Sequence, residues 1–183
     1  MRRARQGDAT AFGELVRRHQ AAALRVATVV LGTSEGADDV AQQAMERVWR
    51  AMPRFDEQRA FRPWLLQIVA NAARNDRRSR GRFARLAVRA ASHAPYGNGA
   101  ASAVDPAEAI VADLERQRVV EALNRLRAED RIVIALRHFE QLSEREMADV
   151  LDVPNGTVKS RLSRAMTRLR AELDRDEEVS RHG

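Results

Sequence analysis

Five cationic side chains and no acidic one lie within residues 155–170, a pattern that could bind the phosphates of a nucleic acid. In the same segment Val158, Leu162, Met166 and Leu169 recur at three-to-four-residue spacing, which predicts a helix with one apolar stripe. A helix with an apolar stripe and a cationic outer face fits the DNA major groove. An ordinary amphipathic helix with a solvated charged face would give a similar pattern. The sequence of the preceding segment helps to decide between this interpretation and DNA binding.

That preceding segment has the features of the first half of a helix-turn-helix. Ser143 and Glu146 form a capping box, Ser-x-x-Glu, which predicts a helix over 143–151. Asp152 stands at the turn, where aspartate tolerates the left-handed conformation better than most residues, and Pro154 favours entry into the next helix. DNA binding by the second helix is therefore the favoured interpretation.

The outer face of this second helix supplies the candidate DNA contacts. Side chains near the helix start are placed for base edges, and the other cations for phosphates. The expected base-edge contacts are Lys159, Ser160, Ser163 and Arg164, and the expected phosphate contacts are Arg161 and Arg168, with Thr157 on the same face.

The composition of the chain excludes several other kinds of site. The 183 residues include no cysteine, which excludes disulfides, thiolate metal sites and thiol redox chemistry. The four histidines are scattered without metal-ligand spacing, and no nucleophile–base set or phosphate loop occurs, so we expect no metal, no cofactor and no catalysis. No apolar run approaches the roughly 20 residues that span a membrane, and no signal peptide opens the chain, so we expect a cytoplasmic protein without membrane insertion.

Apolar periodicity and capping signals predict an all-α protein of two small helical domains. Asp8 caps a first helix that ends at Gly32, and Pro106 opens a four-helix second domain that contains the helix-turn-helix. The apolar run 132–136 fits a strand by composition, but we expect a helix because its neighbours are helical. The expected boundaries are 1–82 for the first domain, 83–105 for a flexible linker, 106–174 for the second domain and 175–183 for a polar tail.

Three sequence blocks resemble the extracytoplasmic-function sigma factors of bacteria. The first is AFGELVRRH followed by ADDVAQQAMERVWRAMPRFD, the second is FRPWLLQIVANAARNDRRSR, and the third is LSEREMADVLDVPNGTVKSRLSRAMTRLR. They occur in the family's order over about 8–82 and 106–173, and the string GTVKSRL is highly specific to it. The resemblance implies a protein that binds core RNA polymerase and directs it to a promoter.

The resemblance also implies which residues contact the polymerase. The matching positions lie on the second helix and are Asp39, Gln42 and Gln43, with Arg47 on the same outer face. A clamp helix of the largest polymerase subunits would dock there. Without the resemblance, this face would be interpreted as a solvated surface.

The positions that match the family's minus-ten promoter element lie in the loop at 53–61 and the helix at 62–78. Melted DNA exposes bases, which need a stacking or hydrogen-bonding surface. The expected contacts are Phe55, Asp56 and Phe61 in the loop and Asn71, Arg74, Asn75 and Arg78 on the helix. Trp64 is expected in the core, with a stacking platform as the alternative.

Three positions depart from the family pattern. Asp152 stands where the family usually has glycine, and Arg127 where it often has proline, which bears on stability. Asn75 replaces a common aspartate, which bears on base preference.

In the implied mechanism the two domains hang on the linker in the free protein, and the polymerase holds them apart over two promoter elements. The last helix then reads the minus-thirty-five element as duplex, while the earlier helix captures single-stranded bases of the minus-ten element. An anti-sigma factor is implied as a further partner.

Two other classes of protein stay open: a stand-alone helix-turn-helix regulator that binds palindromic DNA as a dimer, and a helical adaptor with no DNA role.

Overall fold

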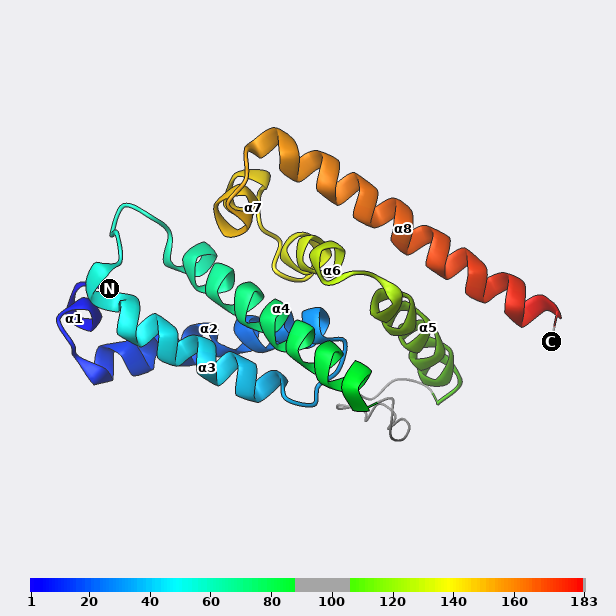
Figure 1. Ribbon diagram of the computed structural model, residues 1–183, viewed down its shortest axis with the longest axis horizontal. Coiled ribbons are helices and arrows are strands. Elements are labelled where there is room, and N and C mark those ends of the chain that lie inside the picture. Colours follow the sequence, from blue (N-terminus) through cyan, green and yellow to red (C-terminus); the bar gives the residue numbers. More distant parts are fainter. Residues whose placement is uncertain (88–105, 183) are drawn as a thin grey trace.

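The computed structural model describes residues 1–87 and 106–182, with side chains over 1–80 and 115–176. Every regular element in those ranges is helical, which confirms the predicted all-α class (Figure 1). The predicted linker, 83–105, lies largely outside the described residues, and its first residues continue a helix as far as Ala87.

The first domain has helix ends that are fixed by local chemistry. The Asp8 carboxylate accepts a hydrogen bond from the Ala11 amide at 2.9 Å, which lowers the pKa of that carboxyl. Gly32 ends the helix in the left-handed conformation, with φ +81°, so both predicted ends are confirmed. The elements are α1 (Arg2–Arg5), α2 (Ala9–Leu31), α3 (Ala37–Ala51), the 3-10 turn η1 (Met52–Arg54) and α4 (Phe61–Ala87).

The core of the first domain lies where α2, α3 and α4 meet. Fully buried side chains are Val26 and Val30 of α2, Val48 of α3, and Leu65 and Val69 of α4. Residues three or four apart share one side of a helix, so each helix buries one stripe and leaves its other side to solvent. Burial of a side chain of this size stabilises the fold by roughly 1.5–3 kcal/mol. The packed core therefore holds the outer faces of α3 and α4 in place.

The second domain is built from α5 (Pro106–Arg125), α6 (Ala128–Ile134), the π-helical turn η2 (Ala135–Phe139), α7 (Glu144–Leu151) and α8 (Asn155–His182). The run 132–136 is helical as predicted, although it passes from α6 into η2. α8 continues to His182, whereas the sequence pattern predicts a polar tail from 175. Arg125 of α5 holds this extension, because it pairs with Glu172 at 2.9 Å and also with Asp176.

The predicted helix-turn-helix is formed by α7, the turn and α8. The Ser143 amide donates to the Glu146 carboxylate at 2.8 Å, and the Glu146 amide donates to the Ser143 hydroxyl at 3.3 Å, so the capping box is complete. These hydrogen bonds lower the pKa of Glu146. Asp152 has φ 53° and ψ 53°, the left-handed conformation expected for it, which costs roughly 1–2 kcal/mol in a residue other than glycine.

The two domains pack against each other, so the prediction that they hang apart on the linker is wrong for this structure. α4 lies against α6 and α7, and α2 lies against α6 and η2 (Figure 1). The contact contains a completely buried carboxylate, Glu140, which binds Arg25 and Arg62 of the first domain. Burial of an unpaired carboxylate is costly, so these partners from the other domain stabilise the contact. Periodicity could not reveal it, because Glu140 resembles a surface acid in the sequence.

His19 of α2 links the stability of the first domain to pH. Its ring centroid lies 5.2 Å from that of Phe61. Burial, with the positive charges of Arg18 and Arg62, lowers the pKa of His19 from its ordinary 6.5. The unfolded chain therefore binds a proton at a higher pH than the folded domain does. This contribution to stability is present above about pH 6.5 and is lost as the pH falls toward the folded pKa.

We expect His19→Gln to flatten the fall in the free energy of unfolding between about pH 7.5 and pH 5.5. Urea titrations at several pH values measure that slope. His138 is an exposed histidine of the second domain and provides the control, because His138→Gln should leave the slope as it is. Equal slopes for wild type and His19→Gln would show that His19 does not couple folding to pH.

Candidate nucleic-acid interface

The outer face of α8 has the predicted division between an apolar and a cationic side. Val158 and Ala165 are fully buried against the rest of the domain. Lys159, Arg161 and Arg164 are exposed on the other side of the helix. The exposed predicted contacts also include Ser160 and Ser163, and Thr157 is half-buried. The structure thus brings these six side chains together on the first three turns of α8.

Local hydrogen bonds hold part of this face in position. The Ser160 hydroxyl donates to the Thr157 carbonyl at 3.0 Å, and Arg164 Nε donates to the Ser160 carbonyl at 3.1 Å. Lys159 and Arg161 make no hydrogen bond or ion pair with any residue that the structure describes. Their charges are therefore available to a polyanion without the loss of an existing partner.

Arg168 is placed differently from the other predicted phosphate contacts. Its Nη1 lies 2.8 Å from both carboxylate oxygens of Asp130, a buried residue of α6. The side chain of Arg168 is 42% exposed, so this pair is half in solvent. Arg168 therefore joins α8 to α6 and positions the helix. Sequence reasoning could not separate it from Arg161, because the buried acid that it binds lies 38 residues away.

This difference predicts that replacement of Arg168 lowers stability, whereas replacement of Arg161 lowers DNA affinity. Arg168→Ala should lower the free energy of unfolding by about 1 kcal/mol, since it leaves the buried Asp130 carboxylate short of a partner. Arg161→Ala should leave stability unchanged and weaken duplex binding at all sequences. Chemical denaturation and duplex titration of the two variants measure both quantities. Equal stability of the two variants would contradict the positioning role of Arg168.

The outer face of α4 holds the predicted helical contacts for single-stranded DNA. Asn71, Asn75 and Arg78 are exposed, and Arg74 is half-buried. Arg74 Nη2 donates to the Asn71 side-chain oxygen at 2.7 Å, which fixes both groups relative to each other. Arg78 lies 3.3 Å from Glu129 of the second domain. The four residues follow at three-to-four-residue spacing and form one continuous polar strip.

The loop before α4 is organised around aromatic rings. Phe55 is buried, with its ring centroid 4.5 Å from that of Trp64 and 5.9 Å from that of Phe61. Phe55 therefore cannot present its face to a base in this structure, in contrast to the prediction, because it anchors the loop to the core. Trp64 and Phe61 are half-buried in the same cluster. Asp56 is exposed, and its carboxylate accepts the Gln58 amide at 2.9 Å.

The outer face of α3 displays all four residues predicted to contact the polymerase. Asp39, Gln42, Gln43 and Arg47 are exposed. Gln42 and Gln43 follow Asp39 by three and four residues, and Arg47 follows Gln43 by four, so the residues share one side of the helix. Asp39 and Arg47 make no ion pair with another residue that the structure describes, so the face is open to a partner.

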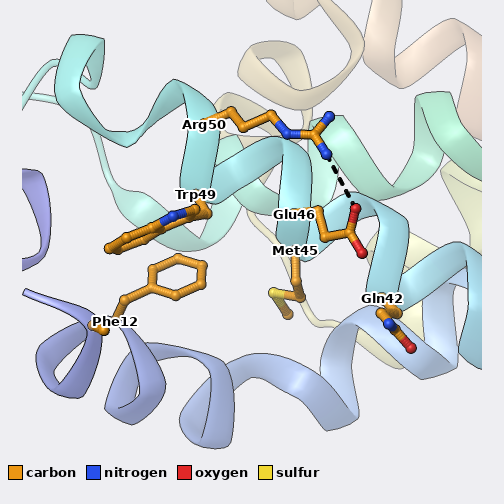
Figure 2. A pocket seen from close by; sticks show the side chains of 7 residues that line it. Phe12, Gln42, Met45, Glu46, Trp49 and Arg50 are labelled. Atoms are coloured by element: carbon orange, nitrogen blue, oxygen red, sulfur yellow. Dashed lines mark hydrogen bonds and ion pairs between the residues drawn. The ribbon is translucent and has the colours of Figure 1, made fainter. Parts of the chain in front are cut away.

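An apolar groove beside this face was not predicted from the sequence. Figure 2 shows the Phe12 ring of α2 against the Trp49 ring of α3, with Met45 and Gln42 farther along α3. The Phe12 and Trp49 ring centroids are 4.8 Å apart. Sequence periodicity places Met45 and Trp49 on the buried stripe, whereas both are half-buried and line the groove. A possible signal was the position of Met45 and Trp49, three and seven residues after Gln42.

Metal binding and membrane spanning have no support in the part of the chain that the structure describes. There, no group of three or more histidine, cysteine, aspartate or glutamate side chains could hold a metal ion. None of the described helices is long and apolar enough to cross a membrane.

A helix-turn-helix with a cationic outer face defines a DNA-binding protein. The sequence models of two protein families identify which kind. Sigma-70 region 2 matches residues 15–83, and Sigma-70 region 4 matches residues 116–169. The chain belongs to the sigma-70-like family of RNA polymerase sigma factors, in its extracytoplasmic-function group. It is an alternative sigma factor, a protein of transcription initiation.

Individual relatives cover nearly the whole chain. RNA polymerase sigma factor NccH of Alcaligenes xylosoxydans xylosoxydans is 34% identical over 172 residues, which are 94% of this chain and 91% of that protein. The ECF RNA polymerase sigma-E factor of Escherichia coli K12 is 32% identical and covers 89% of this chain and 86% of its own length. The solved structure of CnrH in complex with the cytosolic domain of CnrY has a TM-score of 0.69 and 31% identity, over 95% of this chain and 94% of that chain.

Proposed function

We propose that this chain binds core RNA polymerase through α3, captures the melted minus-ten element with α4 and reads the duplex minus-thirty-five element with α8. One observation carries the proposal: a single chain displays three separate exposed polar faces, one on each of these helices. A protein that bound DNA through its helix-turn-helix alone would need only the face on α8.

The minus-thirty-five element is read in the major groove by the start of α8. Lys159 and Arg164 extend from the second and third turns of the helix and contact base edges, together with Ser160 and Ser163. Arg161 is also exposed on α8, and it contacts a phosphate group of the DNA backbone. Support comes from the complete capping box, which fixes the start of α7, and from the buried Val158, which holds the apolar side of α8 against the domain and leaves its cationic side outward.

The minus-ten element is captured by the polar strip on α4. Asn71 and Asn75 offer side-chain amides for the edges of unpaired bases, while Arg74 and Arg78 contact phosphates. Asp56 is exposed in the loop and Phe61 is half-buried at the start of α4, and these two residues supply contacts for a flipped base. Phe55 contributes indirectly, because it fixes the loop against Trp64.

Core polymerase docks on α3 and on the groove beside it. Asp39 and Gln42 supply the polar contacts, with Gln43 and Arg47 on the same face. Met45 and Trp49 supply the apolar surface that a docking helix buries. The chain needs no metal and no cofactor for this role, and the polymerase performs the chemistry.

An anti-sigma factor is a further proposed partner, in the cytoplasm. Support comes from the solved relative CnrH, which is in complex with the cytosolic domain of CnrY.

A stand-alone helix-turn-helix regulator is the alternative, and a band-shift experiment separates the two functions. A sigma factor should bind a promoter duplex specifically only when core polymerase is added, because each of its DNA-binding faces is small and its second domain carries no basic excess. A stand-alone regulator should bind tightly by itself, as a dimer on a palindromic site. Tight specific binding without polymerase would overturn the proposal.

A further inference from the structure

The contact between the two domains is centred on one carboxylate. Glu140 directly follows the π-helical turn η2, and its side chain is completely buried. Arg25 Nε of α2 donates to its Oε1 at 2.8 Å. Arg62 Nη2 of α4 donates to its Oε2 at 2.6 Å and to its backbone carbonyl at 2.8 Å. The second domain thus carries a buried charge whose two cationic partners both belong to the first domain.

The backbone around Glu140 is shaped for this contact. The π turn inserts an extra residue relative to an α-helix, and such turns often occur at functional positions. The next residue, Gln141, has φ 52°, the left-handed conformation that is costly for a residue other than glycine. Both features turn the chain at Glu140, where an ordinary α-helical end would place the carboxylate differently.

A second set of contacts closes the far side of the interface. Arg77 of α4 donates to the carbonyl of Val30 in its own domain at 3.3 Å and to that of Leu126 in the second domain at 3.4 Å. Burial lowers the pKa of the Arg77 guanidinium, as expected for a group enclosed between two domains. Gly32 has no side chain at the point where Arg131 of the second domain approaches, and a Cβ there would collide with it.

This closed arrangement places the two DNA-reading helices close together. α7 packs on α4, and α8 packs on α7 (Figure 1). Two successive helix-packing distances are about 20 Å. On DNA, the minus-ten and minus-thirty-five elements are about 25 base pairs apart, which is about 85 Å of duplex at 3.4 Å per base pair. The closed chain cannot contact both elements at once, and Arg78 of α4 already faces Glu129 of the second domain.

We propose that Arg25, Arg62 and Glu140 form a latch that holds the free protein in a closed, inactive conformation until its domains separate on the polymerase. The inference rests on the proposed function, because it takes α4 and α8 to read two distant promoter elements. Only the open fraction of molecules can then form a productive complex, so the apparent affinity for its partners is reduced by that fraction. When the latch opens, water solvates Glu140 and both arginines.

The test breaks the latch from its exposed side. Arg25 is half-exposed at the edge of α2, so Arg25→Glu should repel Glu140 without disturbing the core of the first domain. Arg17→Glu makes the same charge change at another exposed position of α2 and is the matched control. Glu140→Gln is a second variant, which removes the charge that both arginines share and keeps the volume of the side chain.

Distances between the domains report the latch directly in the free protein. The chain has no cysteine, so spin labels can be attached at Gln20→Cys on α2 and Ala171→Cys on α8, both exposed positions. Double electron–electron resonance should give one narrow, short distance for wild type and Arg17→Glu. It should give a longer and broader distribution for Arg25→Glu and Glu140→Gln. The same distribution in all four proteins would overturn the latch.

Transcription reports whether the latch inhibits. With core polymerase in excess and the chain limiting, Arg25→Glu should raise the amount of promoter-specific run-off transcript about 5-fold over wild type, and Arg17→Glu should leave it unchanged. Open domains with an unchanged transcript level would show that the contact does not inhibit. If no variant gave a specific transcript, the proposed function would be contradicted, and the distance measurement would decide on the latch by itself.

Discussion

Replacement of both Lys159 and Arg164 by alanine is expected to reduce transcription from a promoter that requires its minus-thirty-five element by about 100-fold or more. Each side chain extends from the exposed face of α8, where a good contact to a base edge contributes roughly 1–3 kcal/mol of discrimination. Neither residue is buried, so the double variant should unfold at the same denaturant concentration as wild type. Run-off transcription with core polymerase measures the loss.

The matched control for this variant is Arg145→Ala with Arg170→Ala, which removes two exposed cations of the same domain outside the proposed reading face. The control should keep most promoter activity, and both double variants should bind core polymerase like wild type. A template without a minus-thirty-five match should respond little to either. If the Lys159 and Arg164 variant transcribed this template and the intact promoter with the same proportional loss, α8 would not be the reader of that element.

Replacement of Asp39 and Gln42 by alanine should give the complementary result, a loss of core polymerase affinity of about 30-fold or more. Two central contacts of a protein interface typically contribute 2 kcal/mol or more, and Gln42 lines the apolar groove of Phe12 and Trp49. Both side chains are exposed on α3, so the fold should be unaffected. Fluorescence titration of labelled chain with core polymerase measures the affinity.

Glu14→Ala with Gln20→Ala is the control for this second variant. It removes an acid and an amide of the same kinds from an exposed side of α2. We expect the control to bind polymerase with unchanged affinity. If the α3 pair and the α8 pair lowered polymerase affinity by equal amounts, the proposed division between a protein-binding face and a DNA-binding face would be wrong.

Local features of the structure could be predicted from the sequence because short-range patterns determine them. Asp8 and Gly32 delimit α2, and the Ser143 capping box begins α7, as their positions in the sequence indicate. Asp152 adopts the left-handed turn expected of it. The apolar stripe of α8 follows from spacing alone, so its opposite, cationic face was predictable too.

Features that depend on distant segments could not be predicted in this way. Arg168 has the same sequence environment as Arg161, and only its approach to the buried Asp130 makes it a structural residue. Phe55 lies in a polar loop, yet it is buried because its ring packs against the ring of Trp64. Glu140 binds partners that lie 115 and 78 residues away. In each case the deciding contact crosses between elements, where periodicity carries no information.

The groove beside α3 is an intermediate case. Met45 and Trp49 belong to the apolar stripe of their helix, as the pattern indicates, but the stripe is wider than the surface that α2 covers. The uncovered part remains half-exposed next to Gln42. A helical wheel predicts which side of α3 these side chains are on. How far they are buried depends on how much of that side the neighbouring helix, α2, covers.

Run-off transcription with purified core polymerase on a set of genomic promoter fragments tests the central claim most directly. We predict transcripts with defined start sites that appear only when this chain is added, and that disappear when either promoter element is replaced. Core polymerase that gave the same transcripts with and without the chain, over all fragments and a range of salt concentrations, would contradict the account.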